Sequence, residues 1–123
     1  MDDEAEITET MVDDVRIVRV AGELDGEEGG AASRGLAPPP DGALATVVDL
    51  SRVTFADSSF LHALLTAQRH HDRAGVPFVL AEAASPVRRL LELTDTARAF
   101  TLVPHLTAAM DVARARGADR RRP

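Results

Sequence analysis

Polar and apolar residues near the start of the chain follow the pattern of two paired strands. Residues 7–11 alternate Ile7, Glu9 and Met11 with two threonines, which indicates a short strand. Asp13 and Asp14 then give a turn, and residues 15–21 form a second segment rich in β-branched residues. The two segments predict a β-hairpin.

The next stretch has no clear periodicity. Gly22 closes the second strand, and residues 25–36 contain four glycines in twelve positions. A helix there would be weak, because each interior glycine costs about 1 kcal/mol relative to alanine. Three consecutive prolines at 38–40 favour an extended linker over residues 37–42. The sequence therefore leaves a first helix over 25–36 undecided.

The middle of the chain predicts a buried strand followed by a long helix. Residues 44–50 are almost continuously apolar, as in a central strand covered by helices. Asp57 is a suitable N-cap and Gly75 a suitable C-terminal stop, and the leucines between them form an apolar stripe with helical spacing. A helix is expected from the residue after Asp57 to the residue before Gly75.

The last third of the chain predicts two further strand and helix pairs. Strands are expected over 76–81 and 99–103. A short helix over 87–93 would begin with Ser85 as its N-cap and Pro86 at its first position. A closing helix over 105–116 would place Leu106, Met110 and Ala113 on one face and stop at Gly117.

This order of elements predicts an α/β fold. The expected architecture is a central mixed, mostly parallel β-sheet of four to five strands with an N-terminal antiparallel strand, packed against about four helices. The 123 residues fit one domain, expected over 1–117. Residues 118–123 are predicted to be a disordered basic tail.

Composition excludes several classes of site and partner. The chain has no cysteine, which excludes disulfides, thiolate metal sites and cysteine nucleophiles. A net charge of −6 argues against nucleic acid as the main partner. No apolar run approaches the ~20 residues that span a bilayer, and the acidic N-terminus does not have the form of a secretory signal. We therefore expect a cytoplasmic protein without a membrane span.

Three segments, in this order, resemble the STAS family, whose best-known members are anti-sigma factor antagonists. They are Val20 with the run Gly22–Asp25, the core segment Val47–Leu61, and Ser85–Leu91. The core segment is the most specific, because it joins a strand ending in D-L-S to T-F-x-D-S at the start of a helix. The resemblance covers residues 7–116 and implies the STAS fold.

The resemblance also implies a function and partners. It implies a protein that binds an anti-sigma factor serine kinase of the GHKL type when unphosphorylated, and that is released when Ser58 is phosphorylated. The kinase would bind ATP itself, so the chain needs no cofactor, and a serine phosphatase would reset the switch. The result is control of sigma-factor-dependent transcription by partner switching, with the chain a monomer or weak dimer.

The candidate site residues gather at the start of the long helix. Ser58 is the predicted phosphorylation site, with Ser59 and Thr54 as weaker candidates, and Asp57 is the helix cap. A phosphate at a helix N-terminus meets free N–H groups and the helix dipole, so phosphorylation should not unfold the domain. The predicted partner-binding residues are Glu23, Asp25, Asp57, Ser58, Ser59, Phe60 and His62.

Several of these residues carry alternatives. Phe60 stands where the family usually has glycine, and it would either block the approach of a partner or offer a new apolar contact. Asp25 would serve equally well as the cap of the next helix, and Asp49 is another charged residue able to contact a partner. No metal site is expected, because the adjacent His70 and His71 cannot share a helix face.

Three other functions remain to be weighed. A serine hydrolase would need a base and an oxyanion hole, and Ser58 lies outside any G-x-S-x-G motif, so no enzymatic activity is expected. A phosphoacceptor receiver domain would need a lysine, which the chain lacks. The alternative kept is a STAS interaction module without a switch, either a scaffold in a stress complex or an accessory of a lipid transporter.

Overall fold

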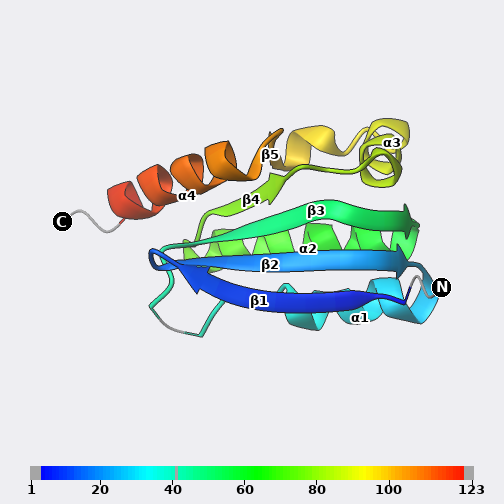
Figure 1. Cartoon of the computed structure of the whole chain (residues 1–123), viewed down its shortest axis with the longest axis horizontal. Helices are drawn as coiled ribbons and strands as arrows, with labels where there is room; N and C mark the ends of the chain where they lie inside the picture. The colour runs from blue at the N-terminus through cyan, green and yellow to red at the C-terminus, as the bar shows by residue number, and fades with distance from the viewer. Residues whose placement is uncertain (1–3, 41, 121–123) are drawn as a thin grey trace.

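The computed structural model describes residues 4–40 and 42–120, which form one five-stranded sheet with helices on both faces (Figure 1). The strands are β1 (Glu6–Val12), β2 (Val15–Leu24), β3 (Ala45–Ala56), β4 (Phe78–Ala81) and β5 (Thr101–Val103). The helices are α1 (Gly26–Gly35), α2 (Ser58–Ala74), α3 (Ser85–Leu93) and α4 (Leu106–Arg120), with a 3₁₀ turn at Ala97–Ala99. Within the described residues, none of these helices combines the length and apolar character needed to cross a membrane.

The sheet has the predicted mixed topology. Its order is β1-β2-β3-β4-β5, with β1 antiparallel to β2 and every other pair parallel. Asp13 and Asp14 join β1 to β2, and both have left-handed backbone conformations, with φ of 50° and 65°. Two such residues match the twist of a tight hairpin. The hairpin and the α/β fold class are therefore confirmed.

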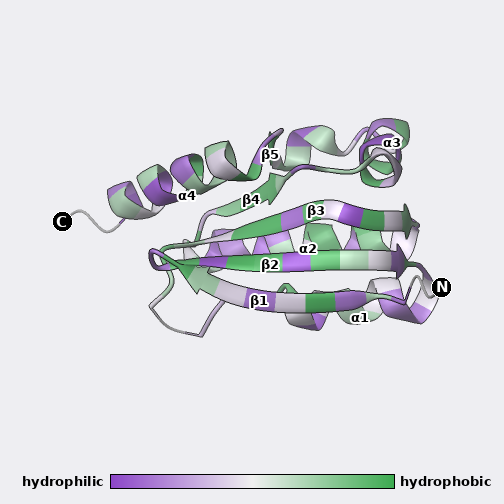
Figure 2. Cartoon of the chain, in the orientation of Figure 1, coloured by the Kyte–Doolittle hydropathy of each residue, from purple (hydrophilic) through white to green (hydrophobic). Residues whose placement is uncertain are grey.

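Two apolar layers hold the sheet between its helices. On one face, Val18 and Val48 belong to the larger core cluster, together with Leu64 of α2 and Leu91 of α3. On the other face, Val15, Ile17 and Val47 pack with Ala109, Met110 and Ala113 of α4. The apolar bands of the strands and the polar outer sides of the helices are visible in Figure 2. In the view of Figure 1, α1 and α2 lie behind β1, β2 and β3.

The glycine-rich stretch does form a helix, α1, which the sequence left undecided. It lies beside α2 on the same face of the sheet (Figure 1). Gly29 and Ala32 of α1 are buried. A side chain at Gly29 would collide with Ser59 and would lie 2.9 Å from the Phe60 nitrogen, so the absence of a Cβ permits the close approach of the two helices. Tertiary packing therefore outweighs the low helix propensity of this segment.

The strand β3 is longer than predicted and irregular near its end. It continues from Ala45 to Ala56, beyond the end of the predicted apolar run of 44–50. Its pairing with β2 shifts register twice, between Arg19 and Ala21 and between Gly22 and Glu23 of β2. At each shift β3 contains one more residue than the paired part of β2, which is the arrangement of a β-bulge. The bulges turn the last residues of β3 toward the start of α2.

Three details of the last third differ from the sequence-based expectation. The N-cap of α3 is Ala84, and Ser85 is already the first helical residue. Gly117 does not end the last helix, because α4 continues to Arg120. Gly117 is instead buried against Leu44, where an added Cβ would lie 2.8 Å from the Leu44 carbonyl oxygen. The predicted disordered tail is thus helical over 118–120, and residues 121–123 lie outside the described residues.

Candidate functional site

The candidate site begins at Asp57, which links the starts of two helices. As N-cap of α2, its Oδ1 accepts hydrogen bonds from the Ser59 backbone N–H at 2.9 Å and from the Ser59 hydroxyl. Its Oδ2 accepts a bond from the backbone N–H of Gly26, the first residue of α1, at 3.1 Å. The Ser59 hydroxyl is the main reason that the pKa of Asp57 lies below its usual value, and the N–H of Gly26 acts in the same direction. The carboxylate is therefore held ionised at the junction.

Ser58 and Ser59 differ sharply in accessibility, although they are adjacent. Ser58 is exposed at the first position of α2. Ser59 is half-buried and lies against Gly29 of α1. Its hydroxyl donates a hydrogen bond to the Asp57 carboxylate. Of the two serines, Ser58 is the one that an external enzyme could reach without disturbing the helix junction.

Phe60 does not lie on the docking surface, contrary to the sequence-based expectation. Its side chain is 0% exposed and belongs to the larger core cluster. It shares one face of α2 with Ala63, Leu64 and Ala67, which follow at helical spacing and are also buried. The side chain of Phe60 is therefore part of the core in this structure and is not exposed to solvent.

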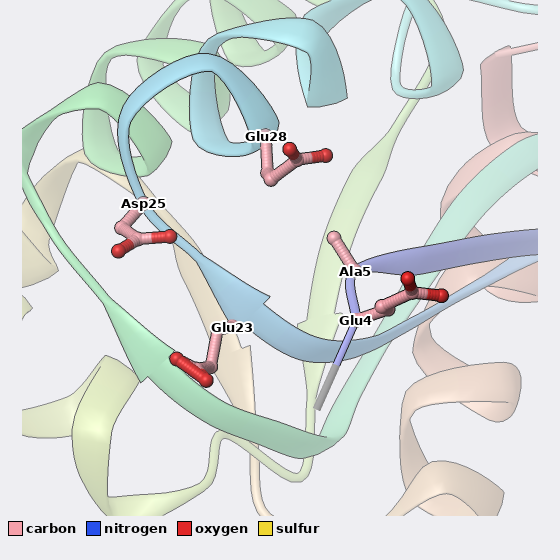
Figure 3. A pocket seen from close by; sticks show the side chains of 5 residues that line it. All are labelled: Glu4, Ala5, Glu23, Asp25 and Glu28. Atoms are coloured by element: carbon pink, nitrogen blue, oxygen red, sulfur yellow. The ribbon is translucent and has the colours of Figure 1, made fainter. Parts of the chain in front are cut away.

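An acidic cleft of about 450 Å³ lies at the end of β2, where α1 begins (Figure 3). It is lined by Glu4, Ala5, Glu23, Asp25 and Glu28. Glu4 precedes β1 and Glu23 lies at the end of β2, whereas Asp25 is at the N-cap position of α1 and Glu28 is in its first turn. No group of three metal-ligating side chains that could hold an ion is found among residues 4–40 and 42–120. The cleft therefore presents negative charge and carboxylate acceptors toward solvent.

Three expected partner contacts can be placed around this cleft and the start of α2. Asp25 occupies the N-cap position of α1, but its side chain makes no capping hydrogen bond and is exposed. Glu23 is exposed at the end of β2, and His62 is exposed one turn along α2 from Ser58. The carboxylate of Asp49 is already engaged within the chain. It accepts a hydrogen bond from the Ser51 backbone N–H and forms an ion pair with Arg19 at 3.8 Å.

A second hollow, which sequence reasoning missed, lies on the other side of Ser58. We call it the β3–α3 groove; its volume is about 330 Å³. It is lined by Thr54, Phe55 and Ala56 of β3 and by Ser85, Pro86, Arg89, Leu90 and Leu93 of α3. In the sequence, Phe55 stands out only as part of the family motif. Its exposure depends on the bulged end of β3, which has no local sequence signal.

Sequence reasoning also missed a buried polar network beneath α2. His71 is 0% exposed; its Nδ1 lies 2.8 Å from the Ala67 carbonyl oxygen and its Nε2 lies 2.9 Å from Thr46 Oγ1. Arg16 donates to the same Thr46 hydroxyl oxygen and to the Ala37 carbonyl oxygen. Burial, with Arg16 adding repulsion, lowers the pKa of His71 to about 4. This network links α2 to β2 and β3 and so contributes to the fold.

The comparison to protein families agrees with the fold. A family model described as "Mlab, STAS domain" matches residues 7–104. The chain therefore belongs to the STAS domain family. A search of curated protein sequences finds no match.

Solved structures show the same fold in proteins of different roles. An anti-sigma factor antagonist from Mycobacterium paratuberculosis is 25% identical, covers 91% of this chain and 96% of its own, and gives a TM-score of 0.73. The antagonist SpoIIAA in its unphosphorylated form is 18% identical, and the match covers 89% of this chain and 97% of SpoIIAA, with a TM-score of 0.68. The phosphorylated form of this Bacillus protein is 15% identical over 89% and 99%, with a TM-score of 0.64.

The fold alone does not define one role. A sulfate transporter family protein from Wolinella succinogenes is 16% identical over 87% of this chain and 90% of its own, with a TM-score of 0.73. At such low identity the likeness concerns the fold. Function has to be argued from the site itself.

Proposed function

We propose that this chain is an anti-sigma factor antagonist. In its unphosphorylated state it binds an anti-sigma factor serine kinase, and phosphorylation of Ser58 releases the kinase. The chain takes the role of a phosphoacceptor and binding module, with no catalysis and no cofactor of its own. The likeness to an anti-sigma factor antagonist over nearly the whole chain supports this general role.

The accessibility of Ser58 is the observation that carries the proposal. A kinase must bring the hydroxyl oxygen into line with the terminal phosphate of ATP, so the acceptor has to project from the surface. Ser58 meets that need at the first position of α2, whereas Ser59 is engaged with Asp57. A pair of SpoIIAA structures, one phosphorylated and one not, gives this kind of switch a precedent on the same fold.

Electrostatics explains how phosphorylation would end the complex. The phosphate adds about −1.5 to −2 charges at a helix start, where free N–H groups stabilise it within this chain. In the complex the same oxygens would face the phosphates of the kinase-bound nucleotide, because the transfer has just taken place between them. A loss of about 3 kcal/mol would weaken binding more than a hundredfold. The switch therefore acts on the interface and leaves the fold intact.

The remaining steps and partners of the proposed switch follow from this reaction. Phosphotransfer consumes the ATP held by the kinase, and a serine phosphatase must hydrolyse the phosphoserine to restore binding. Ser58 is the proposed acceptor, ahead of Ser59 and Thr54. Glu23, Asp25, Asp57 and His62 are the proposed partner contacts around it. All of these steps belong to the cytoplasm, where ATP and RNA polymerase are available.

The test is a capture experiment followed by binding measurements with the purified kinase. Wild type and Ser58→Ala should retain the same kinase from lysate, and Ser58→Asp should bind the purified kinase at least a hundredfold more weakly. Ala115→Asp is the matched control, because it adds the same charge at an exposed position of α4. Mass spectrometry after incubation with ATP should place the phosphate on Ser58. Equal binding by all four proteins would refute the switch.

A non-switching STAS module is the second candidate. It is favoured by the sulfate transporter family neighbour, which shows that the fold also occurs in a transporter family. Such a module, either a stress-complex scaffold or a lipid-transporter accessory, would bind its partner irrespective of Ser58. The variant Ser58→Asp therefore separates the two candidates in a single binding measurement.

A further inference from the structure

The β3–α3 groove exposes two large apolar side chains next to the proposed phosphorylation site. Phe55 is 48% exposed and Leu93 is 80% exposed, and both line the groove. Single exposed apolar residues are common on protein surfaces, but two that share one hollow form a patch that water solvates poorly. Ala56, two residues before Ser58, lines the same groove. A molecule seated there would therefore lie beside the phosphoacceptor.

The local backbone explains why Phe55 faces outward. At the second register shift, Gly22 pairs with Val53 and Glu23 pairs with Phe55, which leaves Thr54 as the extra residue of the bulge. Val53, before the bulge, is buried, whereas Thr54 in the bulge and Phe55 after it are exposed. Bulges commonly re-aim side chains next to binding sites. The exposure of Phe55 is thus built into the strand that also positions Ser58.

The groove has one charged lining residue, and it is a cation without a partner. Arg89 makes no hydrogen bond or ion pair with any residue that the structure describes. Its neighbour Arg88 is engaged, since Nε donates to the Ala83 carbonyl oxygen at 3.1 Å and Nη2 donates to the Ser85 hydroxyl at 3.2 Å. The described lining of the groove contains no acidic residue that could pair with Arg89, so its guanidinium is available to a carboxylate of another molecule.

We propose that the β3–α3 groove binds a segment of the anti-sigma factor kinase that carries apolar side chains flanking a carboxylate. The apolar side chains cover Phe55 and Leu93, and the carboxylate pairs with Arg89 through the planar fork of its guanidinium. Buried aromatic and arginine side chains are typical of the residues that dominate binding energy, and Phe55 and Arg89 are of these two kinds. This inference rests on the proposed function and names a second contact surface for the same partner.

The start of α2 and the β3–α3 groove would have different roles in binding the kinase. The start of α2 carries the phosphorylation switch, whereas the groove supplies affinity that does not depend on the state of Ser58. Mutations in the groove should therefore weaken binding of the unphosphorylated chain, and they should slow phosphorylation at low kinase concentration. At saturating kinase the rate of phosphotransfer should stay near that of the wild type.

The binding test uses the purified kinase and three groove variants. Phe55→Ser, Leu93→Ser and Arg89→Glu should each raise the dissociation constant at least tenfold. Leu102→Ser and Arg73→Glu are the matched controls, because Leu102 is also an exposed leucine and Arg73 an exposed arginine, and neither lines the groove. Thermal unfolding of each variant checks that its fold is intact. Replacing the acidic residue of the kinase segment with arginine should restore binding to the Arg89→Glu variant.

A crosslinking test identifies the occupant directly. The chain has no cysteine, so Leu93→Cys creates one attachment point for a photoreactive maleimide. In the complex it should crosslink to a kinase peptide that contains leucine, isoleucine, valine or phenylalanine next to aspartate or glutamate. The same label on Ala115→Cys, an exposed position of α4, should give no such crosslink.

The outcomes separate this inference from the proposed function. If the kinase binds and Ser58→Asp releases it, but the groove variants bind within twofold of wild type, the groove proposal is wrong and the switch stands. Crosslinks to a basic or purely polar segment would also overturn it. If no kinase binds, or if Ser58→Asp binds as wild type does, the proposed function fails and the groove inference falls with it.

Discussion

The carboxylate of Asp57 accepts a hydrogen bond from the backbone N–H of Gly26 at 3.1 Å, and this bond joins the starts of α1 and α2. The first N–H groups of a helix have no partner within the helix. Here one carboxylate serves two helices, since Asp57 Oδ1 also accepts from the Ser59 N–H. The glycine-rich helix α1 is thus tied to the helix that carries the proposed phosphoacceptor.

Removing this carboxylate should loosen both helix starts. Asp57→Ala is expected to lower the free energy of unfolding by about 2 kcal/mol, because a single lost cap costs about 0.5–2 kcal/mol and two helices are affected. Asp57→Asn retains one oxygen acceptor and should lose about half as much. Urea titrations of the three proteins give the comparison. A change below about 0.5 kcal/mol for Asp57→Ala would contradict the shared-cap interpretation.

Two neighbouring glycines of α1 should respond to alanine in opposite directions. An alanine Cβ at Gly29 would collide with Ser59 Oγ and lie 2.9 Å from the Phe60 nitrogen and 3.0 Å from the Leu24 carbonyl oxygen, so Gly29→Ala should destabilise the chain. A Cβ at Gly30 meets nothing within 4 Å. Gly30→Ala should therefore stabilise it by about 0.5–1 kcal/mol through higher helix propensity.

The midpoints of thermal unfolding of the two alanine variants test this contrast. Gly30→Ala should melt above the wild type and Gly29→Ala below it. If both variants shift the midpoint in the same direction, the close approach of α1 to α2 is not the reason for Gly29.

Local signals predicted most of the fold. Asp57 and Gly75 mark the ends of α2 because a capping carboxylate and a left-handed glycine are both readable from sequence; Gly75 has φ of 71°. The hairpin at Asp13 and Asp14 was readable for a similar reason. These features depend on residues close together in the chain.

What the sequence could not predict depends on contacts between distant segments. Gly29 looks unfavourable for a helix until Ser59 is placed against it, and Gly117 looks like a helix stop until Leu44 is placed against it. The burial of Phe60 is different, because its helical spacing with Ala63, Leu64 and Ala67 was already a usable signal. Comparison with the family glycine led to the wrong expectation there.

The buried His71 should make stability depend on pH in a predictable window. In the unfolded chain a histidine titrates near 6.5, whereas in the folded chain the pKa of His71 is lowered to about 4. The unfolded state therefore binds more protons between these values. The stabilising contribution is complete above about pH 6.5, falls as the pH is lowered, and is lost near pH 4.

The groups around His71 support this direction. Burial opposes a charge on the ring, and Arg16 and His70 repel a second cation, while the Ala67 carbonyl oxygen and Asp72 oppose them in part. Between pH 7 and pH 4, the free energy of unfolding of the wild type should fall by up to roughly 3 kcal/mol more than that of the His71→Gln variant. Urea unfolding of both proteins across this range checks it. Parallel curves for the two proteins would show that His71 does not titrate as stated.

An aspartate at Ser58 and one at Ser59 should have opposite consequences for fold and function. Ser58 is exposed at the helix start, so Ser58→Asp should change the free energy of unfolding by less than about 0.5 kcal/mol. Ser59 donates to Asp57 and lies against Gly29, so Ser59→Asp sets two carboxylates against each other in a half-buried junction. That variant should lose about 2 kcal/mol or more, because it removes a hydrogen bond and adds like charge. Chemical denaturation gives the stabilities, and binding of the purified kinase gives the second readout. Ser58→Asp should lose the kinase while keeping its fold. A stable Ser59→Asp that loses the kinase, beside a destabilised Ser58→Asp that still binds it, would mean that the acceptor and structural roles of the two serines have been assigned the wrong way round.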